Sequence, residues 1–418
     1  MNDTSTLRIT RSDLAAEYQR VRAETEHICA LLETDDYQLQ SVVETSPPKW
    51  HIAHVSWFFE AFVLPDYLND YRPFHPSYSY LFNSYYETLG SMQPRPQRGM
   101  LSRPTVKDVY RYRAHVDEQM LELIQRVNDS KWQEFVFKMM LGLNHEQQHQ
   151  ELLFMDIKHN FSVNPLRPAY SEALKSHRSE AVSVTWIERQ GGIAEIGYAG
   201  AGFAYDNETP RHQVLLRDHK LASRPINNEE YLAFMADDGY RRPEFWLSDG
   251  WSLIKRQGWR QPLYWENLDG EWWQFTLGGM RKLNPHEPVC HISFYEADAF
   301  TRWAGKRLPT EAELELMLAE QPLEGNFSDH TVLHPLPGDG QWYGDVWEWT
   351  ASAYSPYPGF KPLAGSMGEY NGKFMCNQMV LRGGCCVTPP GHMRASYRNF
   401  FYLHDRWPFT GLRLAEDT

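Results

Sequence analysis

The spacing of apolar positions divides this chain into two differently patterned parts. In the first third, apolar residues recur every three or four positions, which predicts four helices at residues 12–33, 46–63, 103–129 and 131–160. Ser46-Pro47 and Arg103-Pro104-Thr105 are typical of helix starts. Four helices of this length predict a bundle, and functional side chains in bundles point inward from facing helices.

The helical pattern stops near residue 161. Residues 161–180 gain Pro and Ser and predict a linker, after which short apolar runs such as IAEIG and HQVLL alternate with Gly, Pro, Asn and Trp clusters. In this half we expect helices only at residues 227–238 and 293–304. The predicted fold class is α+β multidomain, with a helical domain at 1–165 and a mixed α/β domain at 180–418 that contains much irregular structure.

One segment of the helical part has no steady period. Residues 64–100 are rich in Pro, Tyr, Asn and Gly, and the segment is too long for a simple connection. We therefore expect a functional loop that is packed by its own aromatic side chains.

Composition and charge narrow the function classes. The 41 Lys and Arg against 54 Asp and Glu give a net charge of −13, which argues against nucleic acid or an anionic membrane as partner. The sequence shows no long apolar span and no export signal, and its five cysteines are an odd number, so we expect a cytoplasmic protein without a disulfide framework. Aromatic residues reach 14%, which suits irregular packing and pocket linings.

The most informative local pattern is a histidine pair in NHEQQHQELL. His145 and His149 are four residues apart on a predicted helix, so both imidazoles can reach one ion. A third ligand is available from His51 or His54 in WHIAHVSWFFE, and three imidazoles suit Fe, Zn, Cu or Ni with open coordination positions. A pair of surface histidines remains the plain alternative, and HEQQH also satisfies HExxH as a string.

Ordered motifs in the second half resemble a known family. They are HISFYEADAFTRWAGKRLPTEAELE, GDVWEWTAS, VLRGGCCVTPPGHMRASYRNFF and RWPFTGLRLA, and this series resembles the C-type-lectin-like domain of formylglycine-generating enzymes. The bundle with WHIAH and HEQQHQE resembles the DinB-like domain that precedes such a domain in the ergothioneine-biosynthesis sulfoxide synthases. The resemblance covers nearly the whole chain.

The resemblance implies a ligand set for non-haem Fe(II). The family's motifs fall on His54, His145 and His149 as iron ligands, leaving His51 as a packed or surface histidine and Glu151 as a structural residue. It also implies that Tyr85 or Tyr86, in LFNSYYETLG, donates a proton near the iron, as in the cysteine-using branch of the family. A phenol is neutral at pH 7 and can serve as such a donor.

The family further implies a set of substrate-binding residues. The imidazole substrate would be held by Gln148 and Asn399, and the trimethylated amino group would lie against aromatic faces near Trp407 and Phe409. The carboxylate of the thiol donor calls for an arginine, for which the candidates are Arg103, Arg394 and Arg398. Other aromatics of the recurring motifs, among them Trp303, Trp342, Trp347 and Trp349, are expected in the core.

The implied function is an O2-dependent synthase that forms a C–S bond. It would join cysteine or γ-glutamylcysteine to carbon 2 of the imidazole of histidine betaine (hercynine) and give a sulfoxide. The related selenoneine synthases, which use a selenosugar, share this domain plan and remain an alternative. A Zn- or Ni-dependent DinB-like transferase or hydrolase, and a non-catalytic binding module, also remain open. Cys385 and Cys386, where relatives have Ser at the first position, are either buried substitutes or a redox-active pair.

Overall fold

The computed structural model describes residues 9–175 and 181–418, which form two compact units. The first unit contains the chain up to residue 164 together with residues 199–205 and 361–372, and the second contains the remainder. Residues 176–180, the last part of the predicted linker, lie outside the described residues. Residues 199–205 and 361–372, which we expected in the second domain, thus pack with the bundle.

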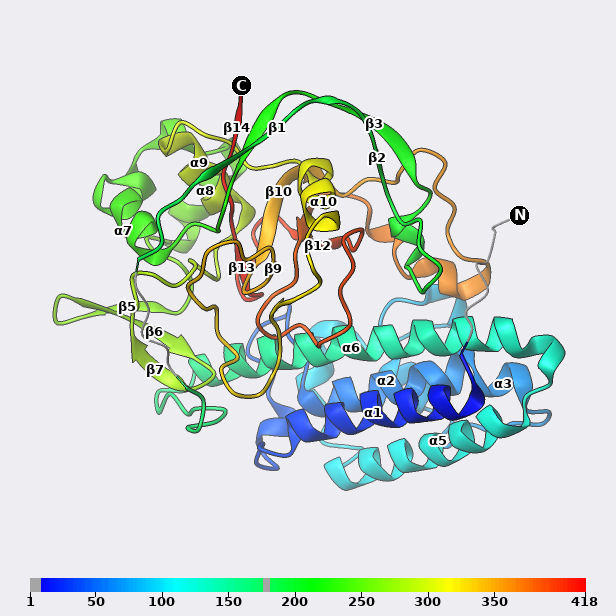
Figure 1. Ribbon diagram of the computed structural model, residues 1–418. Helices are drawn as coiled ribbons and strands as arrows, with labels where there is room; N and C mark the ends of the chain where they lie inside the picture. The colour runs from blue at the N-terminus through cyan, green and yellow to red at the C-terminus, as the bar shows by residue number, and fades with distance from the viewer. Residues whose placement is uncertain (1–8, 176–180) are drawn as a thin grey trace. The chain divides into compact units, whose positions relative to one another are not determined.

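The first unit is the expected helical bundle. Its helices are α1 (Arg11–Cys29), α2 (Pro48–Phe62), α3 (Leu64–Tyr67), α4 (Tyr78–Phe82), α5 (Val106–Arg126) and α6 (Trp132–Ser162). The four long ones match the predicted segments, and Figure 1 shows them side by side, with α2 packed against both α5 and α6.

Local sequence explains where these helices start and which of them is central. Thr105 caps α5 in a reciprocal capping box with Asp108, as the predicted start at Arg103-Pro104-Thr105 requires. Helix α2 begins at Pro48, a residue that fits the first turn because its missing N–H would have no partner there. Nearly every residue of α2 is buried, which identifies it as the central helix of the bundle.

The segment of residues 64–100 forms short helical turns around an aromatic cluster. Beside α3 and α4 it contains a single 3-10 turn at Glu87–Leu89 and a six-residue 3-10 helix at Arg95–Met100. The rings of Phe74, Tyr78 and Phe82 pack against one another and against Tyr112 of α5. This packing agrees with the expectation that the segment is held by its own aromatics.

The second unit is a mixed α/β domain of small sheets. Strands β12 (Asn399–Tyr402), β11 (Gln378–Arg382), β10 (Trp347–Ala353) and β13 (Thr410–Gly411) form one sheet in that order. A second sheet contains β1 (Trp186–Arg189), β4 (His219–Ala222) and β14 (Ala415–Asp417). Strands β2 (Gly192–Ile196) and β3 (His212–Leu216) form a two-stranded sheet. A three-stranded sheet has the order β5 (Trp265–Leu268), β6 (Glu271–Thr276) and β7 (Gly279–Lys282). The short strands β8 (Gly325–Asn326) and β9 (Tyr343–Gly344) form another pair.

Four helices lie among these sheets, and two of them correct the sequence analysis. Helices α7 (Asn228–Ala236) and α9 (Phe294–Trp303) were expected, whereas α8 (Ser248–Gln257) and α10 (Glu311–Ala319) were not. Helix α10 is buried on most of its sides and so lacks the polar face that marks an amphipathic helix. A capping box between Thr310 and Glu313 starts it instead.

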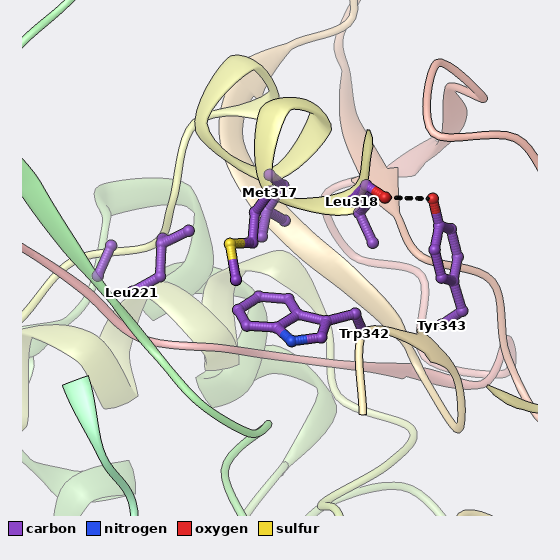
Figure 2. Packing of buried hydrophobic residues seen from close by; sticks show 7 residues of the cluster. Leu221, Met317, Leu318, Trp342 and Tyr343 are labelled. Atoms are coloured by element: carbon purple, nitrogen blue, oxygen red, sulfur yellow. Dashed lines mark hydrogen bonds between the residues drawn. The ribbon is translucent and has the colours of Figure 1, made fainter. Parts of the chain in front are cut away.

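Three of the four motif tryptophans of the second unit lie in the core as expected. Trp342, Trp347 and Trp349 are buried, while Trp303 is half-buried. Figure 2 shows the indole of Trp342 beside Met317 and Leu318 of α10 and Leu221 of β4, with the Tyr343 hydroxyl donating to the Leu318 carbonyl at 2.9 Å. Cys385 and Cys386 are also fully buried.

Candidate metal centre

The structure brings His54, His145 and His149 together inside the bundle. His54 projects from α2, and the other two project from one face of α6 because they are four residues apart. One ring nitrogen from each lies within 4.8 Å of the others, and the side chains are buried. The three histidines that the family resemblance selected therefore form a compact, nitrogen-only donor set.

The contacts within this cluster fit a shared metal ion. The Nε2 atoms of His54 and His145 are 3.1 Å apart. Two nitrogens that are each about 2.1 Å from one ion, at about 90° to each other, would lie about 3.0 Å apart. The Nδ1 atom of His54 is 2.6 Å from the Phe82 carbonyl oxygen, to which it donates, so its Nε2 lone pair points into the cluster.

Burial keeps these imidazoles neutral, as metal binding requires. Desolvation lowers the pKa of His145 to about 3 and lowers the pKa of His54 and of His149 well below its ordinary value. For His54 and His149, repulsion from the neighbouring histidines lowers the pKa further. A neutral ring offers a lone pair to a cation, so the donor set is competent at neutral pH.

His51 is a buried partner of the cluster. Its Nδ1 lies 2.7 Å from Nδ1 of His149, and its Nε2 lies 2.9 Å from the carboxylate of Asp156. Spacing alone left His51 and His54 as equal candidates for the third ligand. In the structure, Nε2 of His54 faces His145, whereas the ring nitrogens of His51 face His149 and Asp156, and only His54 belongs to the compact donor set.

A tyrosine that the sequence analysis missed lies next to the cluster. The ring of Tyr370 is centred 5.6 Å from that of His145, and its hydroxyl donates to the amide oxygen of Gln148. Tyr370 stacks on Tyr205 at 5.5 Å between ring centres. It belongs to residues 361–372, a Gly-rich segment without periodicity, and no signal in the sequence connects it to the bundle.

The segment that carries Tyr370 is fastened to the loop with the two predicted tyrosines. The carboxylate of Glu369 accepts hydrogen bonds from the backbone N–H groups of Glu87 and Thr88 at 3.0 and 3.1 Å. Tyr85 is half-buried, and its ring is centred 6.3 Å from that of Tyr370. Tyr86 is fully buried, with its hydroxyl 3.5 Å from that of Tyr85, and burial raises its pKa well above 10.

The remaining predicted residues lie in different surroundings. Asn399 begins β12, where its side-chain oxygen accepts from the N–H of Phe400. Trp407 and Phe409 are buried, and their rings pack against Phe401 and His291, respectively. These contacts hold both rings within the second unit.

The three candidate arginines differ in how far their charge is already neutralised. Arg398 is buried and bound to both carboxylate oxygens of Glu311, at 2.9 and 3.1 Å. Arg394 is bound to Glu208, with a shortest distance of 2.8 Å. Arg103 is exposed and donates to the Ser102 carbonyl. The carboxylate partners favour structural roles for Arg394 and Arg398.

Two domain families account for most of the chain. Residues 17–153 match the DinB superfamily, and residues 171–328 and 338–418 match the sulfatase-modifying factor enzyme 1-like domain. The protein thus combines a DinB-type bundle with a formylglycine-generating-enzyme-like domain, which confirms the predicted fold class.

Full-length relatives identify the family more closely. The chain is 30% identical to the hercynine oxygenase of Mycolicibacterium smegmatis, over 98% of this chain and 100% of that protein. It is 29% identical to the hercynine oxygenase of Mycobacterium tuberculosis, over 97% and 98% of the two chains. A formylglycine-generating enzyme from Streptomyces coelicolor is 29% identical over only 47% of this chain. This chain belongs to the hercynine oxygenase family and is an oxygen-dependent enzyme of the oxidoreductase class. Among the described residues, the structure has no helix with the length and hydropathy of a membrane span.

Proposed function

We propose that this protein is an Fe(II)- and O2-dependent hercynine oxygenase of ergothioneine biosynthesis. It would convert a thiol, the C2–H of hercynine and one O2 into a sulfoxide and one water. The observation that carries the proposal is the buried set of three neutral imidazoles, found in a chain that matches hercynine oxygenases along its whole length.

His54, His145 and His149 would hold the iron. When bound, Fe(II) would supply a site for the thiolate and the one-electron chemistry that O2 requires, with three positions left open by the protein ligands. The nearby aromatic rings limit access of water to the cluster. Trp50 stacks on His54 at 4.5 Å between ring centres, and Phe58 lies 4.8 Å from His145.

Gln148, which lies in the same unit as the three histidines, would orient the imidazole of hercynine. The Gln148 side chain accepts from Tyr370, which fixes the direction of its amide, and the amide N–H groups are donors suited to an imidazole nitrogen. Holding the ring would direct carbon 2 toward the sulfur, so that the reacting atoms meet in one geometry.

Three tyrosines are candidates for the proton donor. Tyr85 and Tyr86 are the pair that the family resemblance implies, and Tyr370 is the phenol whose ring packs against His145. Burial favours the protonated form of Tyr86, so this hydroxyl keeps its proton at neutral pH. Tyr370 also contacts Gln148, and its position supports it as the donor.

Other groups would bind the charged ends of the substrates. Arg103, which is exposed, is supported as the carboxylate anchor over Arg394 and Arg398, whose guanidinium groups bind Glu208 and Glu311. The trimethylammonium group would lie against aromatic faces, which attract a cation that has no N–H donors.

Anaerobic reconstitution tests the proposal. The metal-free protein would receive Fe(II) and hercynine, and parallel samples would receive cysteine, γ-glutamylcysteine or a selenosugar before O2 is admitted. We expect a sulfoxide whose mass is that of the thiol, hercynine and one oxygen atom less two hydrogens. A selenium adduct alone would assign the protein to the selenoneine synthases instead.

Two variants make the test specific to the metal centre. His54→Ala should give no product with any donor, while His115→Ala, which removes a half-buried histidine that packs on Phe74, should react as the parent does. Turnover that persists in His54→Ala, or that is supported by Zn(II) or Ni(II) without O2, would refute the proposal. The absence of product from every donor would refute it as well.

A further inference from the structure

Three side chains form a hydrogen-bonded chain that ends at one of the candidate metal ligands. His149 is joined to His51 through their Nδ1 atoms at 2.7 Å, and Nε2 of His51 is joined to the Asp156 carboxylate at 2.9 Å. All three side chains are buried within the bundle. The same carboxylate oxygen accepts the backbone N–H of Ser46 at 2.8 Å, so Asp156 is itself held in place.

The helix geometry explains why these residues meet. Asp156 follows His149 by seven residues on α6, which is about two turns, so both side chains lie on the same face of that helix. His51 is on α2, which packs against this face. One imidazole from α2 therefore spans the two turns of α6 that separate the carboxylate from the ligand.

The chemistry of the groups sets the direction of each hydrogen bond. An ionised carboxylate only accepts, so His51 must donate from Nε2, and a neutral His51 then has an acceptor at Nδ1. His149 must therefore donate from its own Nδ1, which leaves the lone pair of His149 on Nε2. One ring nitrogen of His149 lies within 4.8 Å of ring nitrogens of His54 and His145, and because Nδ1 is bonded to His51 we take Nε2 as the ligand atom; the opposite tautomer would direct an N–H at the metal.

We propose that His51 and Asp156 are positioning residues that fix His149 in its Nδ1–H tautomer and aim its Nε2 at the metal. The inference rests on the proposed function only in that the three histidines bind a divalent metal. His54 obtains the same orientation from the Phe82 carbonyl. Nδ1 of His145 has no hydrogen-bond partner among the residues that the structure describes. Among the residues that the structure describes, the His51–Asp156 pair is thus the one set of side chains that orients a ligand at this centre.

The test compares two replacements of His51 that differ in hydrogen-bond polarity. A glutamine can present its amide oxygen to His149 and its NH2 group to Asp156, which reproduces the donor and acceptor order of neutral His51. An alanine removes both bonds. We expect His51→Ala to weaken Co(II) binding by about 10- to 100-fold, the usual range for loss of a partner that orients a ligand. His51→Gln should recover most of this loss.

Metal-free full-length protein would be titrated with Co(II) in competition with a chromophoric chelator, and the visible absorption of bound Co(II) would be recorded. His115→Ala is the matched control and should bind Co(II) as the parent does, while His54→Ala is the reference that lacks one ligand. Asp156→Asn keeps the size of the side chain but removes its charge, and it should weaken binding by about 10-fold. Thermal melting of the metal-free variants would show whether each remains folded.

Several outcomes would overturn the inference. In the first, His51→Ala binds Co(II) with the same affinity and absorption as His115→Ala. In the second, the Co(II) affinity of His51→Gln is no higher than that of His51→Ala. In the third, the parent protein binds no Co(II). If His51→Ala does not fold, His51→Gln and Asp156→Asn decide between the same outcomes. Because metal affinity is measured without turnover, a parent that binds Co(II) through His54 but makes no sulfoxide would refute the proposed function alone.

Discussion

Two neighbouring residues of α6, His145 and Glu146, belong to buried polar clusters of opposite character. Glu146 accepts from Arg22 and Arg113 at 2.9 and 2.7 Å and from the Thr25 hydroxyl at 2.7 Å, and the two arginines also pair with Asp117 and Glu26. His145 faces His54 and His149 instead, and that donor set contains only imidazoles. The first cluster pairs opposite charges within the chain, whereas the second consists of neutral donors that would suit a cation.

The contrast separates stability from function. A buried ion-pair network is satisfied internally, and the removal of one partner leaves unpaired charge that destabilises the fold. A cluster of neutral imidazoles has lone pairs directed at one another, and a cation would stabilise it. Because consecutive residues of a helix point about 100° apart, the two clusters lie on different faces of α6, and single substitutions should affect either metal binding or folding, with little overlap.

The largest effect is expected from the loss of a ligand. His145→Ala should abolish sulfoxide formation and lower the affinity for Fe(II) by about 1,000-fold or more, because two imidazoles hold a transition metal weakly. Thermal melting of the metal-free protein should change little, since the variant removes a buried polar ring rather than a charge partner. The measurements are turnover, iron content after gel filtration, and melting temperature. A variant that retains iron would contradict the assignment.

A substitution one residue later should have the opposite profile. Glu146→Ala would leave Arg22 and Arg113 without their shared carboxylate, and we expect the free energy of unfolding to fall by about 3–5 kcal/mol. Urea unfolding of the metal-free protein measures this loss. The matched control is Glu134→Ala on the same helix, whose side chain is mostly exposed and pairs with Lys138, and it should cost less than about 1 kcal/mol. Equal losses in both variants would refute the contrast.

The same carboxylate should give the protein a defined acid sensitivity. The nearby guanidinium groups of Arg113 and Arg22 outweigh the effect of burial and lower the pKa of Glu146 from 4.5 to about 2. The unfolded state therefore binds a proton at a higher pH than the folded state does. The resulting stability is present above about pH 4.5 and is lost as pH falls toward 2.

The expected loss is on the order of a few kcal/mol, because protonation removes the charge that pairs with both arginines. Urea unfolding of the metal-free protein at a series of pH values between 5 and 2 would measure it. Glu146→Gln removes the titrating group, so its stability should fall less steeply over this range. Parallel curves for parent and variant would show that other groups dominate acid unfolding.

Much of the fold and part of the candidate site follow from local sequence. The four long helices were predicted because their apolar positions repeat at helical spacing and because Thr105 marks a start. The pairing of His145 with His149 follows from their spacing on one helix. The choice of His54 over His51 needed the family resemblance, since both lie on α2 and spacing does not distinguish a ligand from its hydrogen-bond partner.

What the sequence did not predict depends on tertiary packing. Helix α10 has no polar stripe because the surrounding sheets bury it on most sides. Tyr370 lies beside His145 only because residues 361–372 pack with the bundle, although they follow β10 in the chain. The partners of Arg398 are also distant in sequence, so the sequence did not show that this candidate anchor is bound to Glu311.

The smallest effect is expected from the loss of a serine hydroxyl at the edge of the ion-pair network around Glu146. Ser56 is on α2, two residues after His54, and its hydroxyl accepts from Arg22 at 3.0 Å and donates to the Ile52 carbonyl at 2.9 Å. Ser56→Ala leaves one N–H of Arg22 without this acceptor but keeps both ion pairs. We expect the free energy of unfolding to fall by about 1.5 kcal/mol, which is typical of a hydrogen bond to a charged group.

Ser162→Ala is the control for this variant, since the Ser162 hydroxyl donates to the neutral carbonyl of His159 near the end of α6. Its loss should be near 0.5 kcal/mol, at about the lower end for a neutral hydrogen bond. Co(II) affinity should be unchanged in both variants, although Ser56 is close in sequence to a ligand. The Ser56 hydroxyl is bonded to Arg22 and to the Ile52 carbonyl, and neither bond involves a histidine of the candidate metal centre. A change in the Co(II) affinity of Ser56→Ala would therefore mean that the two clusters are coupled through α2. Unchanged affinity together with the larger loss of stability would show that α2, like α6, keeps metal binding and folding on separate faces.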